Sequence, residues 1–290
     1  MRRIVLFVLA LFFVLVGNSQ NRQLRIIAIG AHPDDCDSKF GGTAAKFAEM
    51  GHAVKFLSLT NGDAGHQREG GGALGKRRRA EAKEAGRRLG VEYDVLDNHD
   101  AELLPTLQVR HQVIRKIREW DADIVLGLRP NDYHPDHRNA GKVVQDAAYL
   151  VIVPNVTPDT PPLKKNPLFL YMQDHFQKPN PFSPDIVVAI DDTIEKKING
   201  MDAHVSQFYE WLAWVDGKLD EVPEGKAERR EWLAKRVKGR KISPVMRKSL
   251  EKWYGANKAK NVQYAEALEI AEYGLQPSDD EIWKLFPMLR

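Results

Sequence analysis

Two patterns of hydrophobic and polar positions alternate along the middle of the chain. Short apolar runs of strand length lie at residues 24–30, 53–60, 93–97, 124–128, 168–172 and 186–190. Between the first four runs, apolar residues recur at the three- and four-residue spacing of helices that cover a sheet. This alternation predicts an α/β fold with a Rossmann-like, mostly parallel sheet, flanked by helices and joined by right-handed crossovers.

The two ends of the chain depart from this pattern. After Arg2 and Arg3, residues 4–16 carry no charge, and Gly17 and Ser19 follow. Such a run is too short to span a bilayer and is typical of a secretory signal peptide, with a retained membrane anchor as the alternative. We therefore expect a signal peptide at residues 1–19, no stable membrane span after cleavage, and an exported protein, periplasmic or secreted.

The α/β domain is expected at residues 20–216, and residues 217–290 are expected to form a C-terminal helical extension. This extension is basic and contains Trp232, Trp253 and the cationic run 235–241. Interleaved cations and aromatic rings can bind polyanions or sugars. Because acidic residues are scattered among them, we expect the tryptophans to pack on the core and the charges to be solvated.

Net charge and cysteine content limit the possible partners. The formal charge of +3 falls to +1 when Arg2 and Arg3 are removed, so nothing indicates a nucleic-acid partner. Cys36 is the single cysteine, which excludes an intramolecular disulfide. The oligomeric state is left open by the sequence.

Candidate chemistry lies just beyond two of the predicted strands. His32 and Asp35 follow the first strand, and residues 131–137, which include His134 and His137, follow the run 124–128. The carboxyl ends of parallel strands share one edge of a sheet, where ligands bind. If these strands are neighbours, His32, Asp35 and His137 form a three-ligand site with an open position, which suits a catalytic Zn²⁺ or another divalent metal such as Fe²⁺.

The same motifs resemble those of the LmbE-like, or PIG-L, family of zinc-dependent N-deacetylases. Residues 31–54 are similar to the family's opening motif, Ala-His-Pro-Asp-Asp-Glu followed by Gly-Gly, a helix and a strand, and residues 134–137 to its second motif. The resemblance covers about residues 24–215, and the helix between the motifs matches at Arg78, Glu81, Ala85, Leu89 and Gly90. Cys36 departs from the pattern, because it occupies the family's glutamate position.

We assign the chemistry as a hypothesis, supported by the resemblance at the second motif. Asp34 is the general base that takes a proton from the attacking water. His134 faces the developing oxyanion, and Asp136 orients a histidine through its second nitrogen. Arg68, in the glycine-rich loop at residues 65–75, is a candidate for binding substrate oxygens.

Other polar residues near the predicted edge are given lesser roles. His99 and Asp100 follow the third strand and are expected to be structural or peripheral. His175 is expected at the surface or behind the ligands, and His204 is held as a neighbour of the site. No Gly-x-Gly-x-x-Gly follows the first strand, so no dinucleotide is expected.

By resemblance, the substrate is an N-acetylated amino sugar, an N-acetylglucosamine-type glycan or glycoside that is cleaved to the free amine and acetate. Hydrolysis of another amide by the same metal site is one alternative. A cysteine hydrolase using Cys36 and His134 is another, as is a non-catalytic secreted sugar-binding protein. Cys36 as a fourth metal ligand is also considered.

Overall fold

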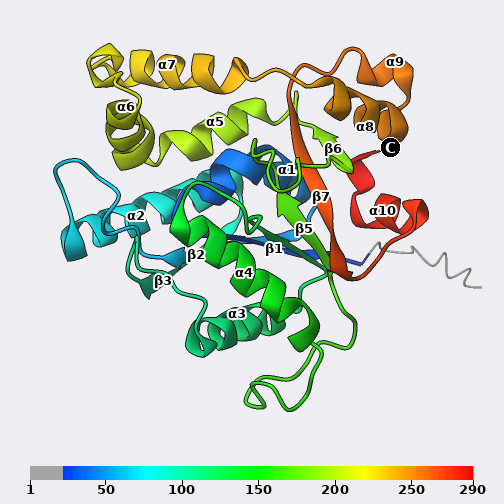
Figure 1. Cartoon of the computed structure of the whole chain (residues 1–290). Coiled ribbons are helices and arrows are strands. Elements are labelled where there is room, and N and C mark those ends of the chain that lie inside the picture. Colours follow the sequence, from blue (N-terminus) through cyan, green and yellow to red (C-terminus); the bar gives the residue numbers. More distant parts are fainter. Residues whose placement is uncertain (1–21, 290) are drawn as a thin grey trace, which may run out of the picture.

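The computed structural model describes residues 22–289 (Figure 1). The predicted signal peptide at residues 1–19 lies outside this range. Within it, no helix combines the length and the apolar character needed to cross a membrane.

A single seven-stranded sheet forms the centre of the described chain (Figure 1). The strand order is β3-β2-β1-β4-β5-β7-β6. Neighbouring strands from β3 to β5 pair in parallel, and β7 is antiparallel to both β5 and β6. The prediction of a mostly parallel sheet is confirmed. The strands are β1 Arg25–Gly30, β2 Ala53–Thr60, β3 Glu92–Asn98, β4 Ile124–Gly127, β5 Leu168–Met172, β6 Ile186–Ala189 and β7 Ala265–Gly274.

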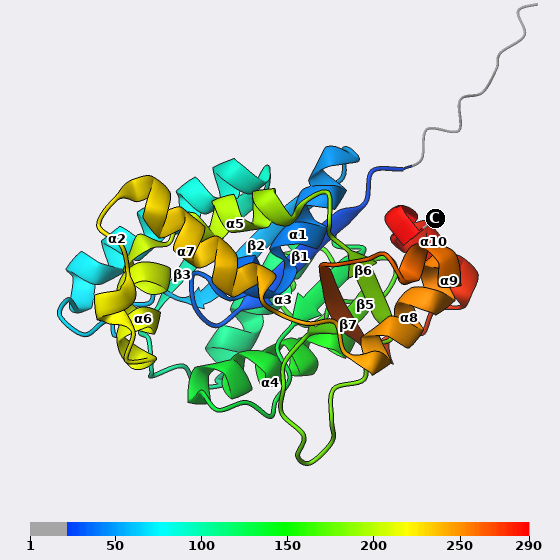
Figure 2. The same cartoon turned by 90° about the horizontal axis from the view of Figure 1, so that it is seen from above.

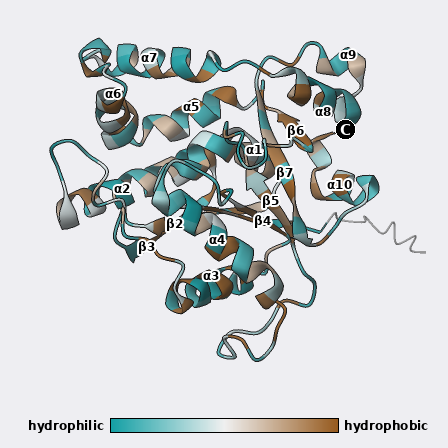
Figure 3. Ribbon diagram, viewed as in Figure 1, coloured by the Kyte–Doolittle hydropathy of each residue, from teal (hydrophilic) through white to brown (hydrophobic). Residues whose placement is uncertain are grey.

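Helices cover both faces of the sheet, with α1 and α2 on one face and α3 and α4 on the other, and α5 packs on the outer side of α1 and α2 (Figure 1). The strands are therefore apolar on both faces, and all four residues of β4 are buried. Hydrophobic residues concentrate in the strands and on the inner sides of the helices (Figure 3). The α-helices are α1 Asp35–Glu49, α2 Gly71–Leu89, α3 Leu107–Glu119, α4 Pro135–Leu150, α5 Ile194–Asp202, α6 Leu212–Val215, α7 Lys226–Lys238, α8 Pro244–Tyr254, α9 Ala256–Ala259 and α10 Asp279–Leu285; η1 Ser206–Trp211 is a π-helix, and η2 Leu219–Glu221 and η3 Pro287–Leu289 are 3₁₀ helices.

The C-terminal segment differs from the predicted helical extension, because it returns to the sheet as well as forming helices. Figure 2 shows β7 lying beside β5 and β6, with α8, α9 and α10 grouped next to them. Alanine, leucine and glutamate dominate β7, and these residue types favour helices in isolation. Pairing with two strands from earlier in the chain overrides that preference.

The two tryptophans singled out in this segment pack as expected. Trp253 is buried, and its Nε1 donates to the Asp185 carbonyl oxygen at 2.8 Å. Trp232 packs against the main core, near the Tyr209 ring. Neither ring is therefore available as an exposed sugar platform.

Candidate metal centre and active site

The two predicted motifs meet at the point where the strand order reverses. β1 pairs with β2 on one side and with β4 on the other, so the loops after β1 and β4 diverge above the sheet. This reversal point is where open α/β sheets bind ligands. His32 follows β1 directly, and His137 lies in the first turn of α4, after β4.

Three side chains from these motifs converge. His32 Nδ1 lies 3.2 Å from His137 Nε2 and 3.8 Å from Asp35 Oδ2, and His137 Nε2 lies 3.4 Å from Asp35 Oδ1. All three residues are buried. The structure thus brings together the donors that the sequence analysis assigned to a metal.

The donor types fit a divalent ion such as Zn²⁺. Two donors bound tetrahedrally at about 2.1 Å lie roughly 3.4 Å apart, close to the 3.2 Å between the two histidine nitrogens and the 3.4 Å between His137 Nε2 and Asp35 Oδ1. His134 lies within 4.8 Å of both His32 and His137 and is the competing third donor. The geometry of two histidines and a nearby carboxylate is that of a metal centre with room for substrate.

Each donor is held by a second contact. Asp35 Oδ2 accepts backbone N–H bonds from Ala31 and His32, both at 2.9 Å. His137 Nδ1 lies 3.0 Å from Asp132 Oδ1, so a proton on Nδ1 leaves Nε2 free as a ligand atom. These contacts fix the donor orientation before any metal binds.

Asp136 is fully buried behind the histidines. Its carboxylate accepts backbone N–H bonds from Ala101 at 2.7 Å and Leu103 at 3.2 Å, and lies 3.2 Å from His32 Nε2. The histidine that it contacts is therefore the candidate ligand His32. The same contacts tie the loop after β3 to the start of α4.

A cavity opens above the candidate metal donors and is called the catalytic cavity below. Asp34, the candidate base, lines it beside His32, Asp35 and His137. Burial raises the pKa of its carboxyl group, and the nearby Arg78 guanidinium opposes this shift. Asp34 Oδ1 lies 3.5 Å from Arg78 Nη2. A carboxylate whose pKa is moved toward neutrality suits a general base and, once protonated, a general acid.

His134 is the N-cap of α4, immediately before Pro135. A residue before proline avoids helical geometry, and proline is favoured at the first helical position, so this sequence starts the helix here. The Asp136 N–H donates to His134 Nδ1 at 3.2 Å, and burial together with the charges of His32 and His137 lowers the pKa of His134. The neutral ring therefore carries its proton on Nε2, where it can donate to an oxyanion.

Two residues at the centre, Asp100 and Arg78, were given no site role from the sequence alone. Asp100 was expected to be structural or peripheral; it is buried rather than peripheral, and its Oδ1 lies 3.0 Å from His32 Nε2. Arg78 is buried from the middle of α2, donates to the Gly62 carbonyl oxygen at 3.1 Å and lies 3.4 Å from Asp100 Oδ2. Asp100 follows a predicted parallel strand, and this position could have indicated a role at the site. The burial of Arg78 depends on how α2 packs and has no such indication in the sequence.

Arg68, the predicted substrate contact, is exposed and is not among the residues that line the cavity. Its backbone N–H donates to His66 Nδ1 at 3.1 Å. The cationic side chains that do line the cavity are Lys39, Arg78 and Arg240. A role for Arg68 in substrate binding stays a prediction.

The Cys36 side chain is buried, and its thiol donates to the Ala28 carbonyl oxygen at 3.4 Å. Burial and the neighbouring aspartates raise the pKa of this thiol. A buried, protonated thiol bonded to the backbone of β1 is suited neither to nucleophilic attack nor to metal ligation. The cysteine-hydrolase alternative therefore finds no support in the structure.

The three other histidines considered in the sequence analysis lie behind, beside or outside the site. His204 is fully buried, with Nε2 3.2 Å from Asp37 Oδ2, and does not line the catalytic cavity. His175 lines a neighbouring cavity instead. His99 is exposed and contacts Asp63 at 2.6 Å, so it is peripheral as expected.

The catalytic cavity has a volume of about 500 Å³, in the range of small-molecule sites. Its floor carries the polar groups described above. Its wall is formed by apolar and aromatic side chains from η1 and α6, including Phe208, Trp211 and Leu212. Aromatic rings beside polar groups suit the apolar faces and hydroxyl edges of a sugar ring.

Fold and site together define an α/β protein with a metal-type active centre at the switch point of its sheet. Residues 27–148 match the family described as PIG-L, GlcNAc-PI de-N-acetylase. The diacetylchitobiose deacetylase of Thermococcus kodakarensis is 33% identical over 202 residues, which is 66% of this chain and 73% of the relative. The chain therefore belongs to the PIG-L family of deacetylases, metal-dependent hydrolases that act on carbon–nitrogen bonds.

Two further relatives extend the comparison. The N,N'-diacetylchitobiose deacetylase of Pyrococcus horikoshii, solved with an inhibitor, is 26% identical with a TM-score of 0.63, and the match covers 88% of each chain. The mycothiol S-conjugate amidase of Streptomyces coelicolor is 30% identical over 151 residues, 43% of this chain and 52% of that protein. The family thus includes relatives named for different amide substrates.

Proposed function

We propose that this protein removes the N-acetyl group from an acetylated amino sugar of the N-acetylglucosamine type and releases acetate. The convergence of His32, Asp35 and His137 beside the half-buried Asp34 carries the proposal. The similarity to diacetylchitobiose deacetylases supports the substrate class. Zn²⁺ is the proposed metal, with Fe²⁺ as the alternative.

Each of the site residues has a separate role in the proposed reaction. His32, Asp35 and His137 hold the metal, which when bound lowers the pKa of water and polarises the acetyl carbonyl. Asp34 takes the proton from the attacking water as its oxygen bonds to the acetyl carbon. The His134 Nε2–H donates to the oxygen that gains negative charge. Asp34 then passes its proton to the nitrogen as the C–N bond breaks, which leaves an amine and acetate.

The test is acetate release from N-acetylglucosamine and di-N-acetylchitobiose by the protein as purified, after chelation, and after Zn²⁺ or Fe²⁺ is restored. We expect activity to be lost on chelation and to return with one metal. A sugar that binds and is recovered unchanged in every metal state would instead favour a non-catalytic sugar-binding protein. Turnover of other amides without any amino-sugar turnover would assign the metal site to a different substrate.

We further propose that the protein is exported, from the signal-peptide pattern at residues 1–19. An exported enzyme of this type would act on glycans outside the inner membrane. Fractionation of cells producing the full chain, with the amino terminus of the recovered protein sequenced, tests this. Recovery of an uncleaved chain in the cytosol would contradict it.

A further inference from the structure

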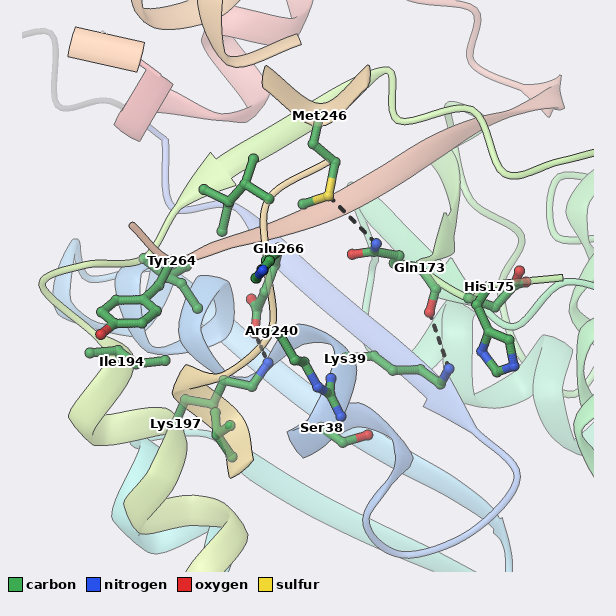
Figure 4. A pocket seen from close by; sticks show the side chains of 16 residues that line it. Ser38, Lys39, Gln173, His175, Ile194, Lys197, Arg240, Met246, Tyr264 and Glu266 are labelled. Atoms are coloured by element: carbon green, nitrogen blue, oxygen red, sulfur yellow. Dashed lines mark hydrogen bonds and ion pairs between the residues drawn. The ribbon is translucent and has the colours of Figure 1, made fainter. Parts of the chain in front are cut away.

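A second cavity, whose lining is drawn in Figure 4, adjoins the catalytic cavity. It has a volume of about 390 Å³ and lies between α1, α5, the start of β7 and the segment that follows α7. Ser38, Lys39 and Arg240 line both cavities. A ligand seated at the metal centre can therefore extend past these three residues into the second cavity.

The lining of the second cavity is rich in positive charge. Four cationic side chains line it, Lys39, Lys197, Arg240 and Lys241, against two acidic ones, Asp174 and Glu266. Asp174 is already neutralised, because Arg129 donates to its two oxygens at 2.7 and 2.6 Å. Because Arg129 pairs with it, the Asp174 carboxylate does not offset the positive side chains that line the second cavity.

Glu266, the other acidic side chain of the second cavity, is also already paired. It is buried and lies 2.7 Å from Lys197 Nζ, and its oxygens accept backbone N–H bonds from Gly42 at 3.0 Å and Thr43 at 2.7 Å. Lys197 and Glu266 thus form a closed pair, drawn in Figure 4. Lys197 is thus the ion-pair partner of Glu266, whose charge also acts on Arg240 from a greater distance.

Lys39, Arg240 and Lys241 are the cations left over. Within residues 22–289, none of the three has a carboxylate at ion-pair distance. Lys39 Nζ donates to the Gln173 carbonyl oxygen at 3.1 Å, and Figure 4 shows the Arg240 guanidinium beside Ser38 and Lys39. Burial lowers the pKa of Lys197, Glu266 opposes this shift, and the charges of Arg240 and Lys39 add to it, so these two cations lie close enough to act on Lys197.

We propose that Lys39, Arg240 and Lys241 form a subsite for an anionic group on the substrate, a carboxylate or a phosphate next to the acetamido sugar. A guanidinium presents paired donors that match either group, and Arg240 and Lys241 are exposed, so an incoming anion can reach them. Arg240 and Lys241 lie outside the family match at residues 27–148, so membership of the family does not assign this subsite. The inference rests on the proposed deacetylation for its position beside the acetyl group.

The experiment compares kcat/KM for acetate release from matched substrates by the full chain. Di-N-acetylchitobiose is compared with N-acetylglucosamine linked to glucuronic acid, and N-acetylglucosamine with its 1-phosphate. We expect at least one anionic substrate to be preferred by about tenfold or more, as befits a hydrogen bond to a charged group. The carboxylate and phosphate arms show which anion the subsite takes, and the preference should shrink at high salt.

Substitutions then test which residues carry the preference. In Arg240→Gln and Lys241→Gln, the ratio of anionic to neutral kcat/KM should fall about tenfold. Lys235→Gln is the matched control, because Lys235 is exposed on α7, pairs with Glu231 and lines neither cavity. Equal kcat/KM for neutral and anionic substrates, or a ratio unaffected by both variants, would overturn the subsite.

A direct binding measurement separates this inference from the proposed function. Calorimetric titration of glucuronate and of inorganic phosphate should show binding to the wild type and to the Lys235→Gln control. Binding should be about tenfold weaker in Arg240→Gln. If no substrate releases acetate but this pattern holds, the proposed function fails and the anion site stands; if neither anion binds and acetate is still released without an anionic preference, the subsite alone fails.

Discussion

At the scale of single residues, His32 organises the centre because its two nitrogens face different partners. Nδ1 faces His137 and Asp35, and Nε2 faces Asp100 and Asp136. Burial lowers the pKa of His32, but the hydrogen bonds to Asp100 and Asp136 and the charge of Asp35 outweigh it and raise the pKa to about 10. The carboxylates behind the ring therefore fix its orientation and hold the proton on Nε2, so metal binding at Nδ1 requires only the proton on that nitrogen to be lost.

Asp34→Asn tests the general base. The amide keeps the size of the side chain but cannot accept a proton, so kcat should fall by about two to four orders of magnitude while the metal is retained. Metal content by mass spectrometry, alongside steady-state acetate release, checks both parts. Asp35→Ala serves as the contrasting variant that should lose metal as well, and an unchanged kcat in Asp34→Asn would remove Asp34 from the mechanism.

Asp100→Asn tests the carboxylate that sequence analysis had set aside. Loss of the charge behind His32 Nε2 should reduce metal affinity or activity about 10–100-fold. Asp97→Asn is the matched control, because Asp97 lies in β3 three residues before Asp100 and has an exposed side chain that contacts Arg79. Competition with a chromophoric chelator measures the metal affinity, and equal affinities in the two variants would argue that Asp100 is structural only.

At the scale of elements, α4 carries three candidate site residues within its N-cap and first turn, so the position of this helix against the sheet sets the geometry of the centre. Gly141 allows α4 to pack closely there, because a Cβ at this position would lie 2.4 Å from the Leu128 carbonyl oxygen, just beyond β4. The helix can approach the end of β4 closely because no side chain intervenes. His137 is brought to His32 by this close packing.

Gly141→Ala should push α4 away from the end of β4. We expect a loss of about 1–3 kcal/mol in the free energy of unfolding, as for other overpacked sites, together with weaker metal binding. Gly72→Ala is the control, because a Cβ there meets nothing within 4 Å in the first turn of α2. Denaturant unfolding of the metal-free proteins measures the first effect, and wild-type stability in Gly141→Ala would show that α4 accommodates the methyl group.

At the scale of the whole molecule, the C-terminal segment is part of the sheet and of the candidate substrate cavities. β7 lies between β5 and β6, so it completes the hydrogen bonding of both strands. Arg240, from the segment before α8, lines the catalytic cavity. The predicted division at residues 216 and 217 therefore crosses a continuous structure.

A chain that ends at residue 216 should fail to fold cooperatively. Without β7, β6 loses its partner strand and β5 becomes an exposed apolar edge, which favours aggregation. The chain from residue 20 to residue 290 is the control and should unfold in one cooperative transition. Circular dichroism and thermal melting compare the two, and a cooperative melt of the shorter chain would establish an independent domain at residues 20–216.

The sequence by itself determined the parallel part of the sheet and the positions of the motifs at its edge. Strongly apolar runs such as 26–29 and 124–128 have few alternatives to buried strands, and a histidine just past such a run must emerge at the strand's carboxyl end. The composition of the two motifs indicated a metal because few other functions bring histidines and aspartates together there. These inferences needed only local pattern and the shared edge of parallel strands.

The tertiary structure alone decided what depends on contacts between distant segments. The helix-favouring residues of β7 became extended only because β5 and β6 offered hydrogen-bond partners. Arg78 and Asp100 joined the centre through the packing of α2 and the loop after β3, and Cys36 turned toward Ala28 instead of the cavity. Burial, side-chain direction and charge left unpaired follow from the whole packed chain, which residue types and spacing do not encode locally.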